Sequence, residues 1–248
     1  MGLFDLFRKK SAANTAIDEE ALKRNFISAR RQNQSYTQRE RLDPGVLSGL
    51  FTETKKTRME KIGDMDAPGS RLMVCDPCYL GSNMVKPMER ATKPGKYPVY
   101  AAIMNTQMTG RCVSAVKVKV SNELTVRHEI AMPLGYKVWN VDDPGVYFGI
   151  SVETGVACVT DDVTELPFAA YMNRFYDTHP GKDLITDTLL PLVEEKGYAM
   201  WQIPGTEYTI PVFASGLGQG MYNAFWGFDK DNKLTELVFP MVYPELFE

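Results

Sequence analysis

The chain has 248 residues, of which 44% are hydrophobic and 24% are charged. This length can bury a full-sized core and this composition is typical of a globular protein, so the sequence is neither disordered nor fibrous. The formal net charge of −3 provides no general attraction to nucleic acid, and we expect no nucleic-acid partner.

Residues 1–66 are predicted to form a helical, basic segment in front of the body. An acidic first turn at Asp18 and apolar residues at helical spacing indicate one helix, and Asp43-Pro44 indicates the start of a second. Residues 1–61 contain 13 Lys and Arg against 8 Asp and Glu. The segment is therefore either a docking arm or a pair of solvated helices.

The sequence also bears on location. It contains no run of about 18–20 apolar residues, so we expect no membrane span. The first ten residues place their charges after their apolar residues, which is the reverse of a secretory signal. Four cysteines in this length fit a reducing compartment better than a disulfide scaffold. We expect a cytoplasmic protein.

Residues 67–248 are predicted to form a mostly β body domain. Short apolar or alternating runs bounded by Pro, Gly and Asn indicate strands, and they cover 71–75, 97–103, 112–120, 124–132, 147–150, 155–159, 209–214, 221–227 and 234–242. One helix is predicted over 182–196, with an interruption at Pro191. The pattern predicts a mainly β (α+β) fold: an antiparallel β-sandwich or barrel-like body with a helical N-terminal segment and one or two body helices.

Turn signals predict two strand pairings. Asn122 is expected to join strand 112–120 to a returning strand 124–132. The Gly-rich run 216–220 is expected to join strand 209–214 to strand 221–227. A nucleotide-binding loop would open a helix and carry a lysine, so this Gly-rich run is interpreted as a tight turn.

The body contains one internal echo. Residues 69–76 (GSRLMVCD) and 154–161 (TGVACVTD) each combine a small-residue turn, an apolar strand and a terminal aspartate. Two matching units can lie side by side or about a pseudo-twofold axis. The alternative is that small turn, apolar strand and terminal Asp are common to any β protein.

Several short segments, taken in order, carry a resemblance to a known family. They read VCDPCY at 74–79, YPV at 97–99, FGI at 148–150, TG at 154–155 with Asp161, and GLGQGMY at 216–222. This ordered set resembles the bacterial domain of unknown function 4241 family over roughly residues 70–243. The resemblance implies a mostly β domain whose function is unsettled.

The chain departs from that family pattern at two positions. The pattern often carries Asp in the hairpin before the TG pair, where this chain has Ser151, and often reads Gly-Asp-Gly in the Gly-rich turn, where this chain has Gln219. If those acids bind a cation in relatives, this chain lacks two of the ligands.

Cys75 and Cys78 form a CxxC motif. This spacing lets two thiolates bind one zinc ion, or lets one thiol resolve the other in redox exchange. A structural zinc site needs four ligands, and the remaining candidates are Cys112, Cys158, His128 and His179. The motif closes a strand, so it is also consistent with a buried Cys75 and a turn residue at Cys78.

Asp76, Glu129 and Asp161 are the candidate catalytic residues. If their strands are neighbours, the carboxylates can hold a divalent metal for hydrolysis, with one of them acting as the general base. Aspartates that precede proline or end a strand also cap turns. The sequence leaves both interpretations open.

Tyr79, Tyr222 and Trp226 are the candidate binding residues. Strand alternation places Tyr222 and Trp226 on one face, which is either an exposed partner surface or part of the core. No complete catalytic set is recognisable, so the leading hypothesis is a non-catalytic recognition protein, such as a bacterial accessory or immunity-type factor, with an unknown protein partner and no cofactor. The alternative is a metal-dependent hydrolase that uses the carboxylate cluster and a divalent metal.

Overall fold

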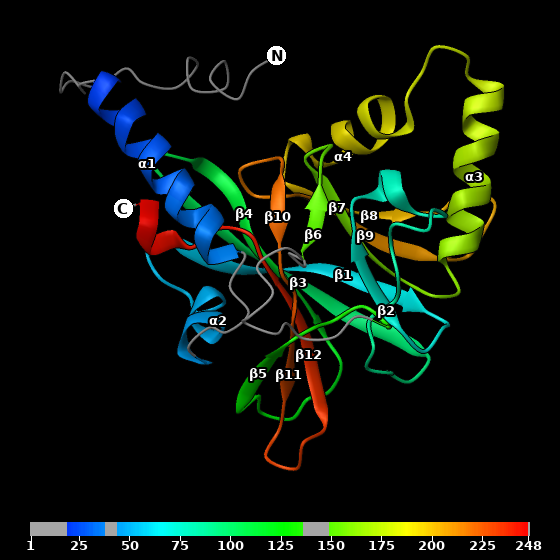
Figure 1. Cartoon of the computed structure of the whole chain (residues 1–248), viewed down its shortest axis with the longest axis horizontal. Helices are drawn as coiled ribbons and strands as arrows, with labels where there is room; N and C mark the ends of the chain where they lie inside the picture. The colour runs from blue at the N-terminus through cyan, green and yellow to red at the C-terminus, as the bar shows by residue number, and fades with distance from the viewer. Residues whose placement is uncertain (1–18, 38–43, 136–148, 248) are drawn as a thin grey trace.

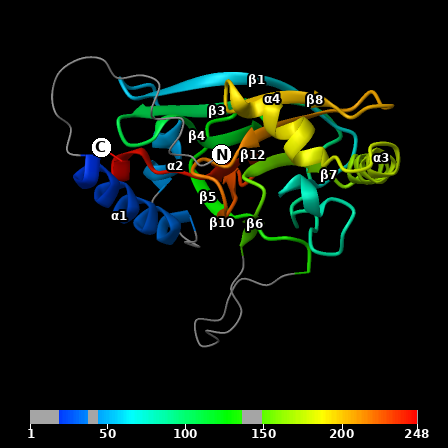
Figure 2. The same ribbon diagram turned by 90° about the horizontal axis from the view of Figure 1, so that it is seen from above.

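Two helices precede the β strands. The computed structural model describes residues 19–37, 44–135 and 149–247, and α1 spans Glu19–Thr37 and α2 spans Pro44–Leu50. Both predicted N-terminal helices are therefore confirmed. The cap predicted at Asp18 lies outside the described residues. Figure 1 shows α1 at the opposite side of the molecule from α3, and Figure 2 shows the same separation from above.

Buried polar side chains hold α1 to the body. Asn33 donates its side-chain amide to the Met241 carbonyl at 2.8 Å and accepts from the Tyr243 backbone N–H at 2.9 Å. At the end of the helix, the Thr37 hydroxyl donates to the Met221 carbonyl at 3.0 Å. These contacts satisfy backbone groups outside the sheet ladders, and they fix α1 against the C-terminal segment.

A six-stranded sheet forms the larger layer. Its order is β1-β3-β4-β12-β11-β5, and every neighbouring pair is antiparallel. The strands span Thr57–Ala67 (β1), Gly95–Thr106 (β3), Gly110–Lys119 (β4), Leu234–Pro240 (β12), Phe225–Phe228 (β11) and Arg127–Ile130 (β5). Strand β1 is not among the elements that the sequence pattern predicts. Its charged residues suit an edge strand, where they oppose pairing with other chains.

A four-stranded sheet forms the second layer, in the order β2-β7-β9-β8, and a two-stranded pair β10-β6 lies beside it. The strands span Leu72–Cys75 (β2), Val156–Asp161 (β7), Thr209–Ala214 (β9), Tyr198–Gln202 (β8), Gly220–Tyr222 (β10) and Ile150–Val152 (β6). Strand β2 is an edge strand, because β7 is its only neighbour in the sheet.

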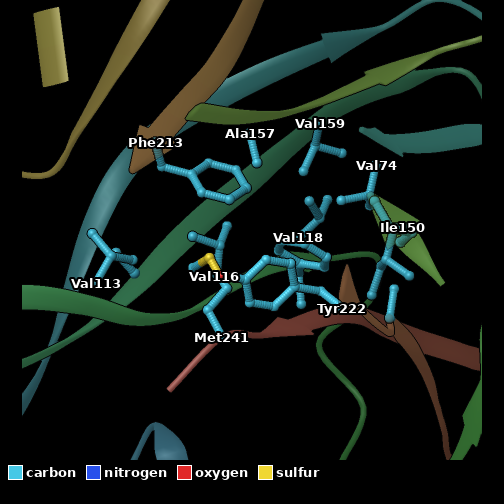
Figure 3. Close-up of a cluster of buried hydrophobic side chains, with 14 of the residues drawn as sticks. Val74, Val113, Val116, Val118, Ile150, Ala157, Val159, Phe213, Tyr222 and Met241 are labelled. Carbon is cyan, nitrogen blue, oxygen red and sulfur yellow. The ribbon is translucent and has the colours of Figure 1, made fainter. Parts of the chain in front are cut away.

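The main core lies between the two sheets. Alternation along β7 turns Ala157 and Val159 inward to this core, and it turns Val156 and Cys158 outward to the helices. Figure 3 shows the inward side chains of both sheets, including Val159, Phe213 and Val118, gathered in one cluster. The period-2 patterns read from the sequence therefore correspond to the two faces of each strand.

Helices cover the outer faces of both sheets. The four-stranded sheet is covered by α3 (Glu165–Thr178), a π-helical turn (Ile185–Leu189) and α4 (Leu190–Glu194). The outer face of the six-stranded sheet packs against α2. The chain stays helical from residue 184 to residue 194, and Pro191 lies in the first turn of α4, directly after the π-helical turn, so the predicted break is not seen there.

The predicted fold class is confirmed. Of the described residues, 37% lie in strands and 27% in helices, the sheets are mostly antiparallel, and they do not close into a barrel. In the described ranges, no helix is both long enough and apolar enough to cross a membrane.

Two predicted strand pairings are wrong. Strand β4 does not pair with β5, because β12 and β11 lie between them. Strand β9 does not pair with β10 or β11. It pairs with β7 and β8, whereas β10 pairs with β6. In both cases, a strand that is distant in sequence lies where the strand after the local turn was expected.

Candidate functional site

Three of the sequence motifs meet at one corner of the molecule, which we call the motif corner (residues 76–79, 151–154 and 215–220). The backbone N–H groups of Glu153 and Thr154 donate to Asp76. The Gln219 side chain donates to the Glu153 carbonyl at 2.6 Å. Ser151 lies opposite Met221 in the β6–β10 pair. Ser151 and Gln219, the two departures from the family pattern, therefore both lie at this corner.

The Asp76 carboxylate at this corner is surrounded by hydrogen-bond donors. Asp76 is 0% exposed. Oδ1 accepts from the Cys78 N–H at 3.0 Å, and Oδ2 accepts from the Glu153 N–H at 2.9 Å and from the Thr154 N–H and hydroxyl at 2.7 and 2.8 Å. These four hydrogen bonds come from three residues, so both oxygens of the buried carboxylate are held by the protein. Asp76 thereby joins the end of β2 to the turn that starts β7.

The Asp161 carboxylate, at the end of β7, is likewise surrounded by hydrogen-bond donors. Its Oδ1 accepts from the Thr164 N–H at 2.7 Å and from the Thr164 hydroxyl at 2.6 Å, and its Oδ2 accepts from the Gly69 N–H. Asp161 is also 0% exposed. Gly69 and Thr154 are the first residues of the two echo segments, so each terminal aspartate binds the start of the other segment.

The two echo segments lie side by side, as one of the two interpretations proposed. Strands β2 and β7 pair antiparallel, with Val74 opposite Val159 and Cys75 opposite Cys158. Both valines occupy the same place in their segments. A pseudo-twofold axis therefore passes between Val74 and Val159, and the hydrogen bonds of Asp76 and Asp161 are related by it.

The predicted carboxylate cluster does not form. Asp161 lies opposite Leu72, whereas Asp76 follows four residues later, so the two aspartates are about 13 Å apart along the ladder. Glu129 belongs to the other sheet, where it pairs with Arg127 at 2.9 Å and Arg90 at 3.7 Å. Within the described ranges, no group of three or more His, Cys, Asp or Glu side chains is arranged to hold a metal ion.

The CxxC cysteines have different surroundings. Cys75 is 1% exposed, and its Sγ lies 3.7 Å from the Sγ of Cys158. Cys78 lies at the start of the next turn and is half-buried. Burial and the hydrogen bond with the Asp76 carboxylate raise the pKa of the Cys78 thiol to about 12. The thiol contact in the structure therefore joins Cys75 to Cys158 across the ladder, whereas the sequence motif points to Cys78.

Two of the three candidate binding residues belong to the core. Trp226 is 1% and Tyr222 4% exposed. The Tyr222 hydroxyl donates within the Gly-rich turn, where the carbonyls of Ser215 and Gly218 lie 2.9 and 2.7 Å away. Of the two interpretations of this aromatic face, the core is therefore the one the structure supports, and neither side chain is part of an exposed surface.

Tyr79 remains partly exposed at the motif corner. A hydrogen bond with Glu153, together with partial burial, raises the pKa of the Tyr79 hydroxyl to about 12. The corner thus presents Tyr79, Glu153 and Gln219 to solvent, whereas Asp76 is buried. This arrangement can form hydrogen bonds to a ligand.

A second surface was missed by the sequence analysis. In the described part of the chain, eleven large hydrophobic side chains are exposed, and six of them lie on or beside the outer helices. We call these six residues the α3 face: Met84, Val163, Leu166, Tyr176, Leu190 and Leu192. Phe168, Met172 and Phe175 recur at helical spacing, which was the signal available for α3.

The loop that carries Met84 packs on the first turns of α3. The Gly81 N–H donates to the Glu165 side chain at 3.2 Å. A Cβ on Gly81 would lie 2.4 Å from the Ala169 Cβ, so the loop approaches α3 closely at this glycine. At the other end, the Tyr176 hydroxyl donates to Asp183 at 3.0 Å, and this bond joins α3 to the segment before α4.

Comparison with protein families assigns the chain. The family model described as protein of unknown function (DUF4241) matches residues 65–239. The chain belongs to this family. The match includes the motif corner and the α3 face, and the resemblance found in the sequence is confirmed. No curated protein and no solved structure matches the chain.

Proposed function

We propose that this DUF4241 protein is a non-catalytic recognition protein of the bacterial cytoplasm, of accessory or immunity type, and that it binds another protein through the α3 face. The observation that carries the proposal is the concentration of exposed apolar side chains on and beside α3 and α4. Leu166 is 70% and Met84 is 71% exposed. Exposed large apolar side chains that gather in one region are a marker of protein–protein contact sites.

Charge supports a partner of particular chemistry. Residues 162–196, which include α3 and α4, contain 7 Asp and Glu against 3 Lys and Arg. On α3 itself, the Arg174 guanidinium lies 5.7 Å from the Tyr171 ring centroid and donates to the Pro204 carbonyl at 3.4 Å. An acidic surface with apolar side chains is complementary to a basic surface with apolar side chains. The partner is therefore a protein that presents such a basic surface.

The surroundings of Asp76 and Asp161 support the non-catalytic part of the proposal. A metal ligand or general base needs oxygen lone pairs that face a substrate, water or ion. Both oxygens of each aspartate accept hydrogen bonds from the protein itself. These donors fit carboxylates that shape turns. The hydrolase alternative has no comparable support.

The experiment compares two exposed leucines at different sites. Leu166→Asp places a charge on the α3 face, and Leu124→Asp is the matched control, since Leu124 is 79% exposed and lies in the loop between β4 and β5. Tagged full-length protein and both variants are used to capture partners from a lysate of the source organism. A captured protein is then purified, and its affinity for each variant is measured by titration calorimetry.

We expect the wild type and Leu124→Asp to bind the same protein with similar affinity. Leu166→Asp is expected to weaken binding by roughly tenfold or more, because a charge is then buried in an apolar contact. The affinity is also expected to fall with added salt, as charge complementarity requires. Equal binding by all three proteins, or loss of binding with Leu124→Asp alone, overturns the proposed surface.

A further inference from the structure

Two buried thiols lie directly opposite each other in the β2–β7 ladder. Cys75 and Cys158 are register partners, and their Sγ atoms are 3.7 Å apart. Directly opposed residues of an antiparallel pair have Cβ atoms about 4.5–5.5 Å apart, and disulfides span about 3.5–4.5 Å between Cβ atoms. A disulfide bond of about 2.05 Å therefore needs only a small approach of the two strands.

The other two cysteines are placed differently, since Cys78 lies half-buried in the turn after β2. Cys112 lies on β4, in the other sheet, and packs against the core between the sheets. Cys75 and Cys158 both lie on the face of their sheet that the outer helices cover, away from the core between the sheets. In the described part of the chain, Cys75 and Cys158 are the cysteines whose sulfur atoms lie close together.

The position of β2 provides a route for a reagent to reach the pair. Strand β2 spans four residues and has one sheet neighbour. Short edge strands open locally at a lower free-energy cost than central strands, and such opening exposes buried groups. Contact with Cys158 and burial raise the pKa of the Cys75 thiol well above its ordinary value. Because the thiolate is the nucleophile, reaction is slow near neutral pH and faster in alkali.

We propose that Cys75 and Cys158 form a disulfide site that links β2 to β7 when the protein meets a small disulfide oxidant. One cysteine thiolate attacks a sulfur of the oxidant, and a mixed disulfide forms while one oxidant thiolate leaves. The second cysteine thiolate then attacks the protein sulfur of that mixed disulfide and releases the other oxidant thiolate. The two cysteine protons pass through solvent to the two departing thiolates, so two protein thiols are oxidised and one oxidant disulfide is reduced.

The bond would tie the edge strand that leads into Asp76 to its neighbour. It would close a chain segment from residue 75 to residue 158, which includes β3, β4, β5 and β6. The site is independent of the proposed partner surface, because neither cysteine is exposed. Failure of one proposal therefore does not decide the other.

The experiment uses the full chain and cystamine, a small disulfide. Protein is incubated with cystamine at pH 7 and pH 9, acid-quenched and treated with N-ethylmaleimide under denaturing conditions. Intact mass then counts the thiols that remain, and peptide mapping without reduction identifies linked peptides. Cys158→Ser removes one member of the pair, and Cys78→Ser is the matched control that leaves the pair intact.

We expect wild type and Cys78→Ser to yield a species lighter by about 2 Da before alkylation, with a linked peptide that contains Cys75 and Cys158. The species should form faster at pH 9 than at pH 7. Cys158→Ser should yield no internal disulfide at Cys75, and should retain a cystamine adduct there. A main product that joins Cys75 to Cys78, loss of the product in Cys78→Ser, or no internal disulfide in folded wild-type protein at either pH overturns the proposal.

Discussion

Val74 and Val159 lie directly opposite each other in the β2–β7 ladder, and they also occupy the same place in the two echo segments. The sequence echo is therefore a structural pseudo-twofold. Its most informative consequence concerns the aspartates, since Asp76 binds the backbone at Thr154 and Asp161 binds the backbone at Gly69. Two residues that resemble catalytic candidates in the sequence thus perform matching structural roles.

This symmetry predicts matching losses of stability. Asp76→Ala and Asp161→Ala each remove a buried carboxylate and leave several buried N–H and O–H donors without partners. We expect each variant to lower the free energy of unfolding by about 3 kcal/mol, because every abandoned donor retains its desolvation cost. Chemical denaturation followed by circular dichroism measures this loss.

Asp231→Ala is the control for both variants. Asp231 is exposed in the loop between β11 and β12, and we expect its change to stay within about 0.5 kcal/mol of wild type. If Asp76→Ala or Asp161→Ala were as stable as this control, the carboxylates would have no structural role and the account of the echo would be wrong.

Gly69 provides a second test of the same ladder. A Cβ at Gly69 would overlap the Asp162 carboxylate and lie 2.8 Å from Asp161 Oδ2. Gly69→Ala must therefore displace carboxylates that hold the turn, and we expect a loss of about 2 kcal/mol in the free energy of unfolding. The matched variant is Gly49→Ala in α2, where a Cβ meets nothing within 4 Å and alanine is expected to stabilise the helix by up to about 1 kcal/mol. Equal effects of the two substitutions contradict this explanation of Gly69.

The acid stability of the fold is expected to depend on Glu236. Burial raises the pKa of this carboxyl, but the hydrogen bond with His128 and the charge of Lys117 outweigh it, so the pKa lies below its ordinary value of 4.5. A carboxyl whose pKa is lowered by folding stabilises the protein above its unfolded pKa, and this contribution is lost as the pH falls through the folded pKa.

We therefore expect the stability difference between wild type and Glu236→Gln to shrink as the pH falls from about 5.5 to 3. Urea unfolding at several pH values measures this difference. The exposed Glu123→Gln is the control, and its difference from wild type should change less over the same range. A difference for Glu236→Gln that is constant or grows in acid contradicts the lowered pKa assigned to Glu236.

The local sequence pattern was sufficient to predict most strands and the fold class. Alternation such as Val116 to Val120 reports burial on one face, and this property depends on nearby residues alone. Pairing depends on distant residues. The turn at Asn122 was expected to fold β5 onto β4, yet β12 occupies that position because it buries Leu237 and Phe239 beside Val116 and Val118.

Strands β1 and β8 and helix α3 were missed, and for β1 and α3 the reason is identifiable. Strand β1 carries Arg58 and Glu60, and its charges hide the strand pattern, although Glu60 is held by Arg111 at 3.1 Å. Helix α3 contains Pro167, which in a sequence suggests a break. Here Pro167 lies in the first turn of the helix, where its missing N–H has no helical partner to lose.

The candidate site was predictable only in part. The echo suggested that two strands with terminal aspartates are neighbours, which the structure confirms. An antiparallel pair places those ends at opposite sides, so the same observation removes the carboxylate cluster. The contact of Cys75 with Cys158 follows from the register, and residue spacing pointed to Cys78 instead.

The central claim, that a protein partner binds the α3 face, is tested most directly by hydrogen–deuterium exchange of the full chain with and without the captured partner. We expect slower exchange on binding in peptides that cover 163–176 and 186–194, and unchanged exchange in peptides that cover 76–79 and 151–154. Protection confined to those two motif-corner segments, or no partner-dependent protection in α3, would contradict the claim.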